Sequence, residues 1–424
     1  MRTIVHPSPF LVHFAGLVLA PFSKSQRQYL LRLADALCLE APAHTLADLQ
    51  RRFLDAPDAS NFADFLRQSP WSADELRQAL QALVARQLLA AQLGLANPEP
   101  VFVTFDDCTA CKDKQTCCLE AVDWTFDHTQ HKNCKGVVHV ACRLHVGAHS
   151  YPFSWRLYLR AKTIRRLNKQ RPKGQRLAFR SKLDLAQEML QELQPYLPPD
   201  AAVYVLFDRW YASAGLLRFI RRQGWYTICA VKSNRRLDGI RLRDHDQRLR
   251  HTRYARVSAA ATDSSRAYHV REITGRLKRV GGRVRVLISR RHPRDPRPKY
   301  FLSTDVTLSA REILTWYGKR WPQEVDFWYL KQELGLGDFR VQPYEAIARW
   351  YAVAYFTLTF LTWRLQEQQR AGVAWKSVAD VLTEHRTWHA RDALRSACEA
   401  VLATGDIEGV VARYVGPRPD REAG

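Results

Sequence analysis

The chain has 424 residues, of which 46% are hydrophobic and 25% are charged. This composition predicts two or three folded units with real cores and excludes a disordered or collagen-like protein. Its 65 Lys and Arg exceed its 42 Asp and Glu, which gives a formal net charge of +23. Residues 231–300 alone hold 21 Lys and Arg against six Asp and Glu. Because a field of this sign attracts polyanions, the composition favours a nucleic acid as the partner.

Two apolar runs do not have the character of membrane segments. Residues 3–23 carry no charge, but His6, Pro7, Pro9 and His13 interrupt them. Residues 350–363 are about six residues short of a bilayer span, so they predict a buried core helix. The nine cysteines are odd in number and form no regular disulfide framework. We therefore expect a cytoplasmic protein that does not associate with a membrane.

Residues 1–97 are expected to form a helical N-terminal domain. Apolar residues recur at helical spacing throughout 23–92. Ser72 and Glu75 have the spacing of a capping box, which marks the start of one of these helices. Pro98 and Pro100 then close the domain.

The period changes in residues 98–234, which predict an α/β unit with mixed strand directions. Apolar, β-branched and aromatic runs indicate strands, and helical periods lie between them. The expected strands are 101–105, 136–146, 151–159, 203–207 and 226–231, and the expected helices are 182–193 and 213–222.

Carboxylates follow two of these strands. Asp106 and Asp107 come directly after the first strand, and Asp208 follows the strand at 203–207. Acidic residues at strand ends are common caps and turns, so each one alone is weak evidence. Two of them can, however, lie side by side at the carboxyl edge of a sheet, where paired carboxylates bind divalent cations.

The remaining sequence is expected to form three further units. Residues 235–303 alternate Arg with apolar residues around Gly281-Gly282, which predicts an Arg-rich β insertion containing a hairpin turn. Helical periods return in 304–370, beginning with a capping box at Ser309 and Glu312. Residues 371–424 predict a C-terminal helical region with a frayed tail from 417.

Four polar side chains in 304–370 share one face of a predicted helix. Tyr317, Arg320, Glu324 and Lys331 follow one another at spacings of three, four and seven residues. Such a face can direct a carboxylate to a metal and cations to phosphates. It can equally be a solvated face with an ordinary i,i+4 ion pair. Pro322 should kink or restart the helix within this set.

At these residues the chain resembles the IS4-like group of DDE transposases. The pattern Tyr, two residues, Arg, three residues, Glu, six residues, Lys is the C-terminal signature of that family, and every interval matches. The segments Phe105-Asp106-Asp107-Cys108-Thr109, Phe207-Asp208-Arg209-Trp210-Tyr211 and Val231-Lys232-Ser233-Asn234-Arg235 agree with it. The resemblance covers about residues 100–365.

The resemblance implies an RNase H-like catalytic core in which three carboxylates bind two Mg²⁺ ions, with Mn²⁺ able to replace them. Asp208 and Glu324 match the second and third carboxylates. The first is open. The family's Asp, any residue, Thr pattern selects Asp107, which we favour slightly, whereas its Asp-Asp-Thr form selects Asp106 and places Cys108 where Thr is expected.

The family's activity implies a transposase that binds the terminal inverted repeats of an insertion sequence and catalyses metal-dependent DNA cleavage and strand transfer. Its partners would be double-stranded transposon ends and target DNA, bound by a homodimer in the bacterial nucleoid. The helical N-terminal domain resembles the family's end-binding region in position and class. DNA contacts are expected from Tyr317, Arg320, Lys331, Lys232 and Arg235. The alternatives are an inactive DNA-binding relic or repressor on the same fold, and a nuclease without strand transfer.

Two further groups of residues have alternative interpretations. Trp210, Trp316, Trp321 and Trp328 can stack on an unpaired base near the cut, but core packing is the commoner role for Trp. A zinc site is the competing metal hypothesis. Its candidate ligands are Cys108, Cys111, Cys117, Cys118, Cys134, His128 and His131.

Overall fold

The computed structural model describes residues 3–41, 43–56, 58–92, 95, 97–127, 131–261 and 264–415. The predicted tail at 417–424 lies outside them. None of the helices in these ranges has both the length and the apolar character needed to cross a membrane.

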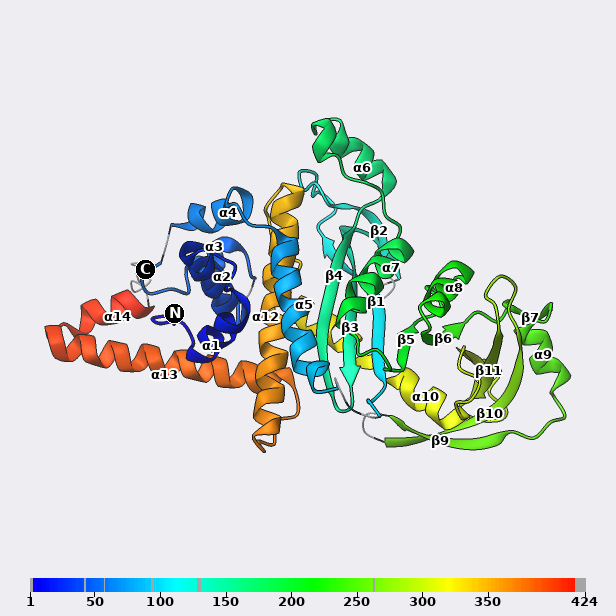
Figure 1. Cartoon of the computed structure of the whole chain (residues 1–424). Coiled ribbons are helices and arrows are strands. Elements are labelled where there is room, and N and C mark those ends of the chain that lie inside the picture. Colours follow the sequence, from blue (N-terminus) through cyan, green and yellow to red (C-terminus); the bar gives the residue numbers. More distant parts are fainter. Residues whose placement is uncertain are drawn as a thin grey trace, which may run out of the picture.

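A mixed ten-stranded sheet is the centre of the molecule (Figure 1). Its strands follow the order β2-β3-β1-β5-β6-β12-β11-β10-β9, and β4 pairs with β3 outside this path. β1 runs parallel to β5 and antiparallel to β3, so the strand directions are mixed as predicted. The bounds are β1 Val101–Lys112, β2 Asp123–Asp127, β3 Lys132–Val146, β4 His149–Tyr158, β5 Val203–Phe207, β6 Tyr226–Val231, β9 Ala255–Ala261, β10 Ser264–Arg276, β11 Arg283–Arg290 and β12 Lys299–Ser303.

The basic segment predicted as a β insertion at 235–303 lies within the main sheet. It is rich in strands, as predicted, and β9, β10, β11 and β12 continue the main sheet because β12 pairs with β6 through Tyr300 opposite Val231. Among the described residues, a short ribbon of β7 (Arg236–Leu237) with β8 (Ile240–Arg241) forms a separate two-stranded sheet, and an isolated bridge joins Leu237 to Leu277. The alternation of Arg with buried Val284 and Val286 fits any half-buried sheet, so it does not tell which sheet the strands join.

β1 is longer than the predicted strand. Instead of ending before the carboxylates, it continues to Lys112 because β3 supplies partners along its whole length, with Asp106 opposite Ala141 and Asp107 opposite Val140. The parallel pairing with β5 stops earlier, at Thr104 opposite Leu206. Side chains alternate along a strand, so Asp106 and Asp107 project to opposite faces of the sheet.

Helices from both ends of the chain share one lobe beside the sheet (Figure 1). The long helix α12, which includes the predicted core helix at 350–363, lies between this lobe and the sheet and is buried along most of its length. The Ser72–Glu75 capping box starts α5 as predicted. The lobe and its boundary contain α1 Pro9–Val18, α2 Lys24–Leu37, α3 Leu46–Gln50, α4 Ala59–Arg67, α5 Ala73–Leu88, α12 Tyr344–Arg370, α13 Val378–Thr404 and α14 Ile407–Val415.

Two large apolar cores hold these layers together, beside a small third cluster of Leu54, Ala393, Val410 and Tyr414. The larger is continuous from Leu11 in α1 through the sheet and α12 to Leu382 in α13, so the helical lobe and the sheet share one core. The smaller lies between part of the sheet and α10, where Phe102 and Leu206 contact Ile313 and its neighbours. The remaining helices are α6 Ala161–Asn168, α7 Lys182–Leu193, α8 Ala214–Arg222, α9 Leu242–Arg248, α10 Ala310–Gly318 and α11 Trp321–Gln332.

Candidate active site

The sheet face covered by α10 carries two of the predicted carboxylates. Phe102, Thr104 and Asp106 alternate onto this face of β1. The register that pairs Thr104 with Leu206 places Asp106 level with Asp208, which directly follows β5. Both acids therefore lie just beyond the last paired residues of β1 and β5. The end of the pairing leaves room there for their carboxylates.

Glu324 approaches the same face from α11. The four signature residues do not lie on one continuous helix, because α10 ends at Gly318 and α11 begins at Trp321, with Pro322 in its first turn. This break follows from the missing N–H and the fixed backbone angle of proline, which suit a helix start and not its interior. Arg320 stands at the junction as the N-cap residue of α11.

Arg320 joins the carboxylates of the strand and the helix. Its Nη1 donates to Asp106 Oδ2 at 2.6 Å, and its Nη2 donates to Glu324 Oε1. The Arg320 side chain is only 17% exposed, so solvent screens these contacts weakly. Two acids that are 218 residues apart in sequence thus meet at one guanidinium. We call Asp106, Asp208 and Glu324 the carboxylate cluster.

Burial and neighbouring negative charge perturb Asp106. Burial raises the pKa of Asp106 to about 7 against the opposing charge of Arg320, and the charges of Asp208 and Asp107 add to the increase. Tyr317, on the last turns of α10, borders the same group. Burial raises the pKa of its phenol to about 12, with Asp208 acting in the same direction and Arg320 against it.

Asp107 points to the other face and is engaged there by two residues that the sequence analysis did not single out. Lys182 Nζ, from α7, lies 2.6 Å from its Oδ2, and Tyr211 donates its hydroxyl to Oδ1 at 3.0 Å. Burial, followed by the charges of Asp107 and Asp106, raises the pKa of Tyr211. Lys182 had one sequence signal, since a cation in the first turn of a helix opposes the helix dipole.

The other predicted DNA-contacting cations have different surroundings. Lys331 is half-buried beside Cys108; burial lowers the pKa of its ammonium, but the neighbouring thiol outweighs this and raises it. Arg235 donates to the backbone oxygen of Ala212 at 3.3 Å. Lys232 is exposed just after β6. The structure therefore does not bring these three cations into the direct contacts that Arg320 makes.

Three of the four candidate tryptophans are exposed, although core packing was the expected role for most of them. Trp210, Trp321 and Trp328 are 46%, 54% and 52% exposed. Only Trp316 packs as expected, with its ring centroid 5.1 Å from that of Phe102. Trp210 also lies under the Lys182 ammonium, at 5.1 Å, and its backbone N–H donates to Asp208 Oδ1 at 2.8 Å.

The donor set suits hard divalent cations. The carboxylate cluster offers oxygen ligands, which Mg²⁺ and Mn²⁺ prefer. Burial, with the charges of Asp208 and Asp107, disfavours the ionised form of Asp106, and a bound cation would offset both effects. Arg320 supplies the compensating charge in the structure.

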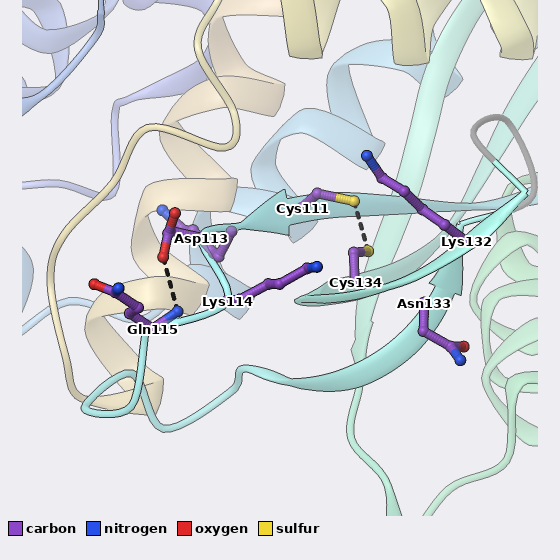
Figure 2. Close-up of a pocket in the computed structure, with 8 residues that line it drawn as sticks. Cys111, Asp113, Lys114, Gln115, Lys132, Asn133 and Cys134 are labelled. Carbon is purple, nitrogen blue, oxygen red and sulfur yellow. Dashed lines mark hydrogen bonds between the residues drawn. The ribbon is translucent and has the colours of Figure 1, made fainter.

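The cysteines predicted as zinc ligands are divided among several places. Cys111 and Cys134 come together, with their sulfurs 2.6 Å apart (Figure 2). The Cys111 thiol donates to Asp127 Oδ2 at 3.3 Å. A cavity of about 420 Å³ adjoins this pair. Cys108 instead lies beside Lys331. Cys117 and Cys118 are exposed neighbours, His131 is exposed, and His128 lies outside the described residues.

The chain is similar to known proteins that act on DNA. The family described as DDE superfamily endonuclease matches residues 17–282, a range that includes Asp106, Asp107 and Asp208 and ends before Glu324. No curated protein matches the chain. One similar solved structure is that of a piggyBac transposase synaptic complex with hairpin DNA, with a TM-score of 0.49 and 11% sequence identity. The match covers 98% of this chain and 82% of that chain.

Proposed function

Given that this chain belongs to the DDE superfamily endonuclease family, which matches more than half of its length, we propose that it is an IS4-like DDE transposase. It binds the inverted ends of a mobile element, cuts the DNA there in a metal-dependent reaction and joins the ends to a target. The signature Tyr317, Arg320, Glu324 and Lys331 is the sequence basis for the IS4-like assignment.

The single observation that carries this proposal is the junction at Arg320. Its contacts unite Asp106 of β1 with Glu324 of α11, in the level of the sheet where Asp208 follows β5. This supports Asp106, and not the slightly favoured Asp107, as the first catalytic carboxylate. Asp107 faces away and is neutralised by Lys182, which gives it a positioning role between β1 and α7.

The carboxylate cluster would hold two Mg²⁺ ions. When bound, these ions help to generate the attacking oxygen nucleophile from water or a DNA 3′-hydroxyl and stabilise the leaving oxygen. Arg320 borders the cluster, and its planar guanidinium matches two phosphate oxygens, so it orients the scissile phosphate. Tyr317 and Lys331 contact the DNA backbone next to the scissile phosphate. The exposed rings of Trp210 and Trp321 are available to stack on DNA bases.

The rest of the DNA contacts the basic segment, residues 231–300. Residues 231–300, which include β9, β10, β11 and β12, carry 21 of the chain's 65 Lys and Arg. Contacts of this kind bind the phosphate backbone and release counterions, and they carry little sequence information. Lys232 and Arg235 lie where this segment leaves β6. The helical lobe contacts the terminal repeat, and two copies of the chain pair the two ends.

The first test compares Asp106→Asn with Asp107→Asn in cleavage of DNA that carries the element's own ends, with Mg²⁺. We expect Asp106→Asn to abolish cleavage with DNA binding retained, because a neutral amide is a poor metal ligand. Asp107→Asn should retain cleavage at a reduced rate. The reverse result would refute the assignment of Asp106. Cut products without joined products would indicate a nuclease, and binding without cutting by the wild type would indicate an inactive DNA-binding protein.

A further inference from the structure

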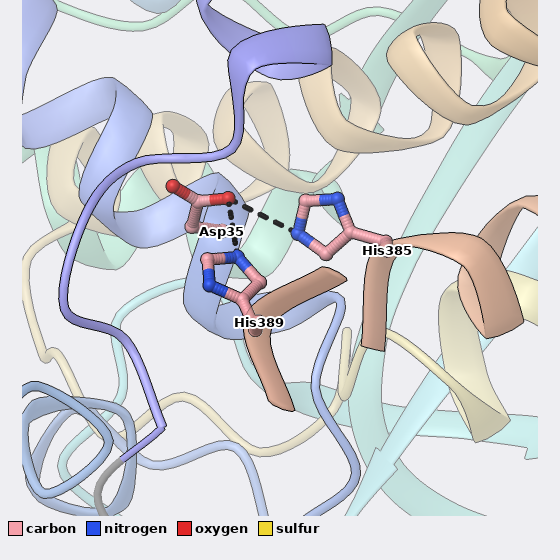
Figure 3. Close-up of side chains that lie close together, drawn as sticks. All are labelled: Asp35, His385 and His389. Atoms are coloured by element: carbon pink, nitrogen blue, oxygen red, sulfur yellow. Dashed lines mark hydrogen bonds and ion pairs between the residues drawn. The ribbon is translucent and has the colours of Figure 1, made fainter. Parts of the chain in front are cut away.

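A second cluster of metal-ligating side chains lies in the helical lobe. Asp35 comes from α2, and His385 and His389 come from α13 (Figure 3). Asp35 and His385 are 1% exposed and His389 is 0% exposed, so all three are withdrawn from solvent. They belong to other elements than the carboxylate cluster, and no step of the proposed function uses them.

The geometry brings the two imidazoles to one carboxylate oxygen. His385 Nε2 lies 3.0 Å from Asp35 Oδ1, and His389 Nε2 lies 3.1 Å from the same atom. The two histidines are four residues apart on α13, a spacing that places both rings on one side of the helix. Their ring centroids are 4.8 Å apart. Three ligand atoms thus converge within 4.8 Å of one another.

Hydrogen bonds and ion pairs account for only part of this arrangement. His389 Nε2 has Asp35 Oδ1 as its hydrogen-bond partner, His385 Nε2 forms an ion pair with the same oxygen, and the Ser8 N–H donates to Asp35 Oδ2 at 3.2 Å. Among the described residues, His385 Nδ1, His389 Nδ1 and the Ser8 hydroxyl have no hydrogen-bond partner. Buried polar groups are normally paired, so these three unpaired atoms favour a further group bound nearby.

We propose that Asp35, His385 and His389 bind a transition-metal dication of the zinc class. Zinc takes imidazole nitrogen and carboxylate oxygen at about 2.0–2.2 Å, and at angles of about 95–110° two such bonds place their donor atoms about 3.0–3.5 Å apart. The separations of 3.0 and 3.1 Å agree with this.

The site has the character of a structural clamp. It is fully buried, so a substrate cannot reach an ion held there, although its three protein ligands are one fewer than the four of a typical structural zinc site. It ties α2 to α13 across some 350 residues of sequence. Nitrogen ligands also separate it from the carboxylate cluster, whose oxygen donors suit Mg²⁺. The site therefore fixes the C-terminal helix on the N-terminal part of the lobe.

The test is a zinc titration of the full-length chain, purified without a metal-affinity tag and stripped with a chelator. Competition with a chromophoric zinc chelator measures the number of tight sites. We expect the variant His385→Gln with His389→Gln to bind one tight zinc ion fewer than the wild type. Cys111→Ser with Cys134→Ser, and separately Asp208→Asn, should retain that ion. Equal stoichiometry in the wild type and the histidine variant would overturn the proposal.

A second measurement needs no variant to fold. Zinc that binds only the folded chain must raise its melting temperature by mass action, so stoichiometric Zn²⁺ should raise the Tm of the stripped wild type, while equimolar Mg²⁺ should not. The milder variant Asp35→Asn should lose most of the zinc response. An unchanged Tm of the wild type with Zn²⁺ would refute the clamp and leave the proposed transposase activity untouched.

Discussion

The helix that carries Glu324 depends on a buried ion pair, and Asp326→Asn tests this dependence. Asp326 lies two residues after Glu324 on α11, and Arg143 Nη1 of β3 contacts both of its oxygens, at 2.6 and 2.5 Å. The two side chains are 8% and 6% exposed. The amide leaves the volume unchanged but leaves the Arg143 charge buried without a counterion. Breaking such a pair costs about 3–5 kcal/mol of stability. This is a large part of the free energy of unfolding of a typical domain, which is roughly 5–15 kcal/mol.

The assay is urea denaturation monitored by tryptophan fluorescence, which gives the free energy of unfolding. The matched control is Asp64→Asn, because Asp64 pairs with Arg67 at 2.8 Å but both side chains are close to half exposed. Exposed pairs contribute up to about 1 kcal/mol. Replacing both buried partners, as Arg143→Met with Asp326→Leu, should recover most of the loss. If Asp326→Asn cost no more than the control, the reasoning about α11 would be wrong.

Three further predictions concern pH, packing and salt. Burial, with a smaller effect of Lys331, lowers the pKa of His139 to about 3. Below about pH 6.5 the unfolded chain therefore binds a proton at His139 that the folded chain does not bind, so the free energy of unfolding decreases as the pH is lowered. The loss of unfolding free energy from pH 7.5 to 5 should be about 2 kcal/mol larger in the wild type than in His139→Gln; equal losses would contradict this. In Gly136→Ala the new Cβ meets the Ala110 backbone oxygen at 2.6 Å, so urea unfolding should show a destabilisation of about 1–3 kcal/mol, and an unchanged midpoint would argue against the close packing of β1 on β3. Duplex affinity, measured by fluorescence anisotropy, should fall by more than roughly tenfold from 50 to 200 mM salt, because many phosphate contacts release counterions; a flat response would remove the basic segment from the interface.

Local patterns in the sequence predicted the elements well. The helix at 182–193 and the strand at 203–207 have the expected bounds, and the capping boxes at Ser72 and Ser309 start helices. These features depend on short-range periodicity and on side chains that satisfy backbone groups within one turn. They could be predicted because their causes lie within a few residues.

Features that depend on distant pairing could not be predicted in this way. β3 extends β1 past the carboxylates, and that extension separates Asp106 from Asp107 onto opposite faces. The pairing of β12 with β6 likewise places the basic segment in the main sheet, which the alternation of Arg with apolar residues does not indicate. The convergence of Asp35 with two histidines of α13 joins opposite ends of the chain, and no spacing in the sequence indicates it.

Cleavage of DNA with the element's own ends, by the wild type beside Glu324→Gln, tests the central claim most directly. Glu324 and Asp106 both contact Arg320. In the proposed function Glu324 is a metal ligand and Arg320 contacts the phosphate, so replacing Glu324 should remove a metal ligand and leave the phosphate contact in place. We predict Mg²⁺-dependent cuts at the ends by the wild type, none with EDTA, and none by Glu324→Gln, with DNA binding by the variant within about twofold. Unchanged cleavage by Glu324→Gln would contradict the account.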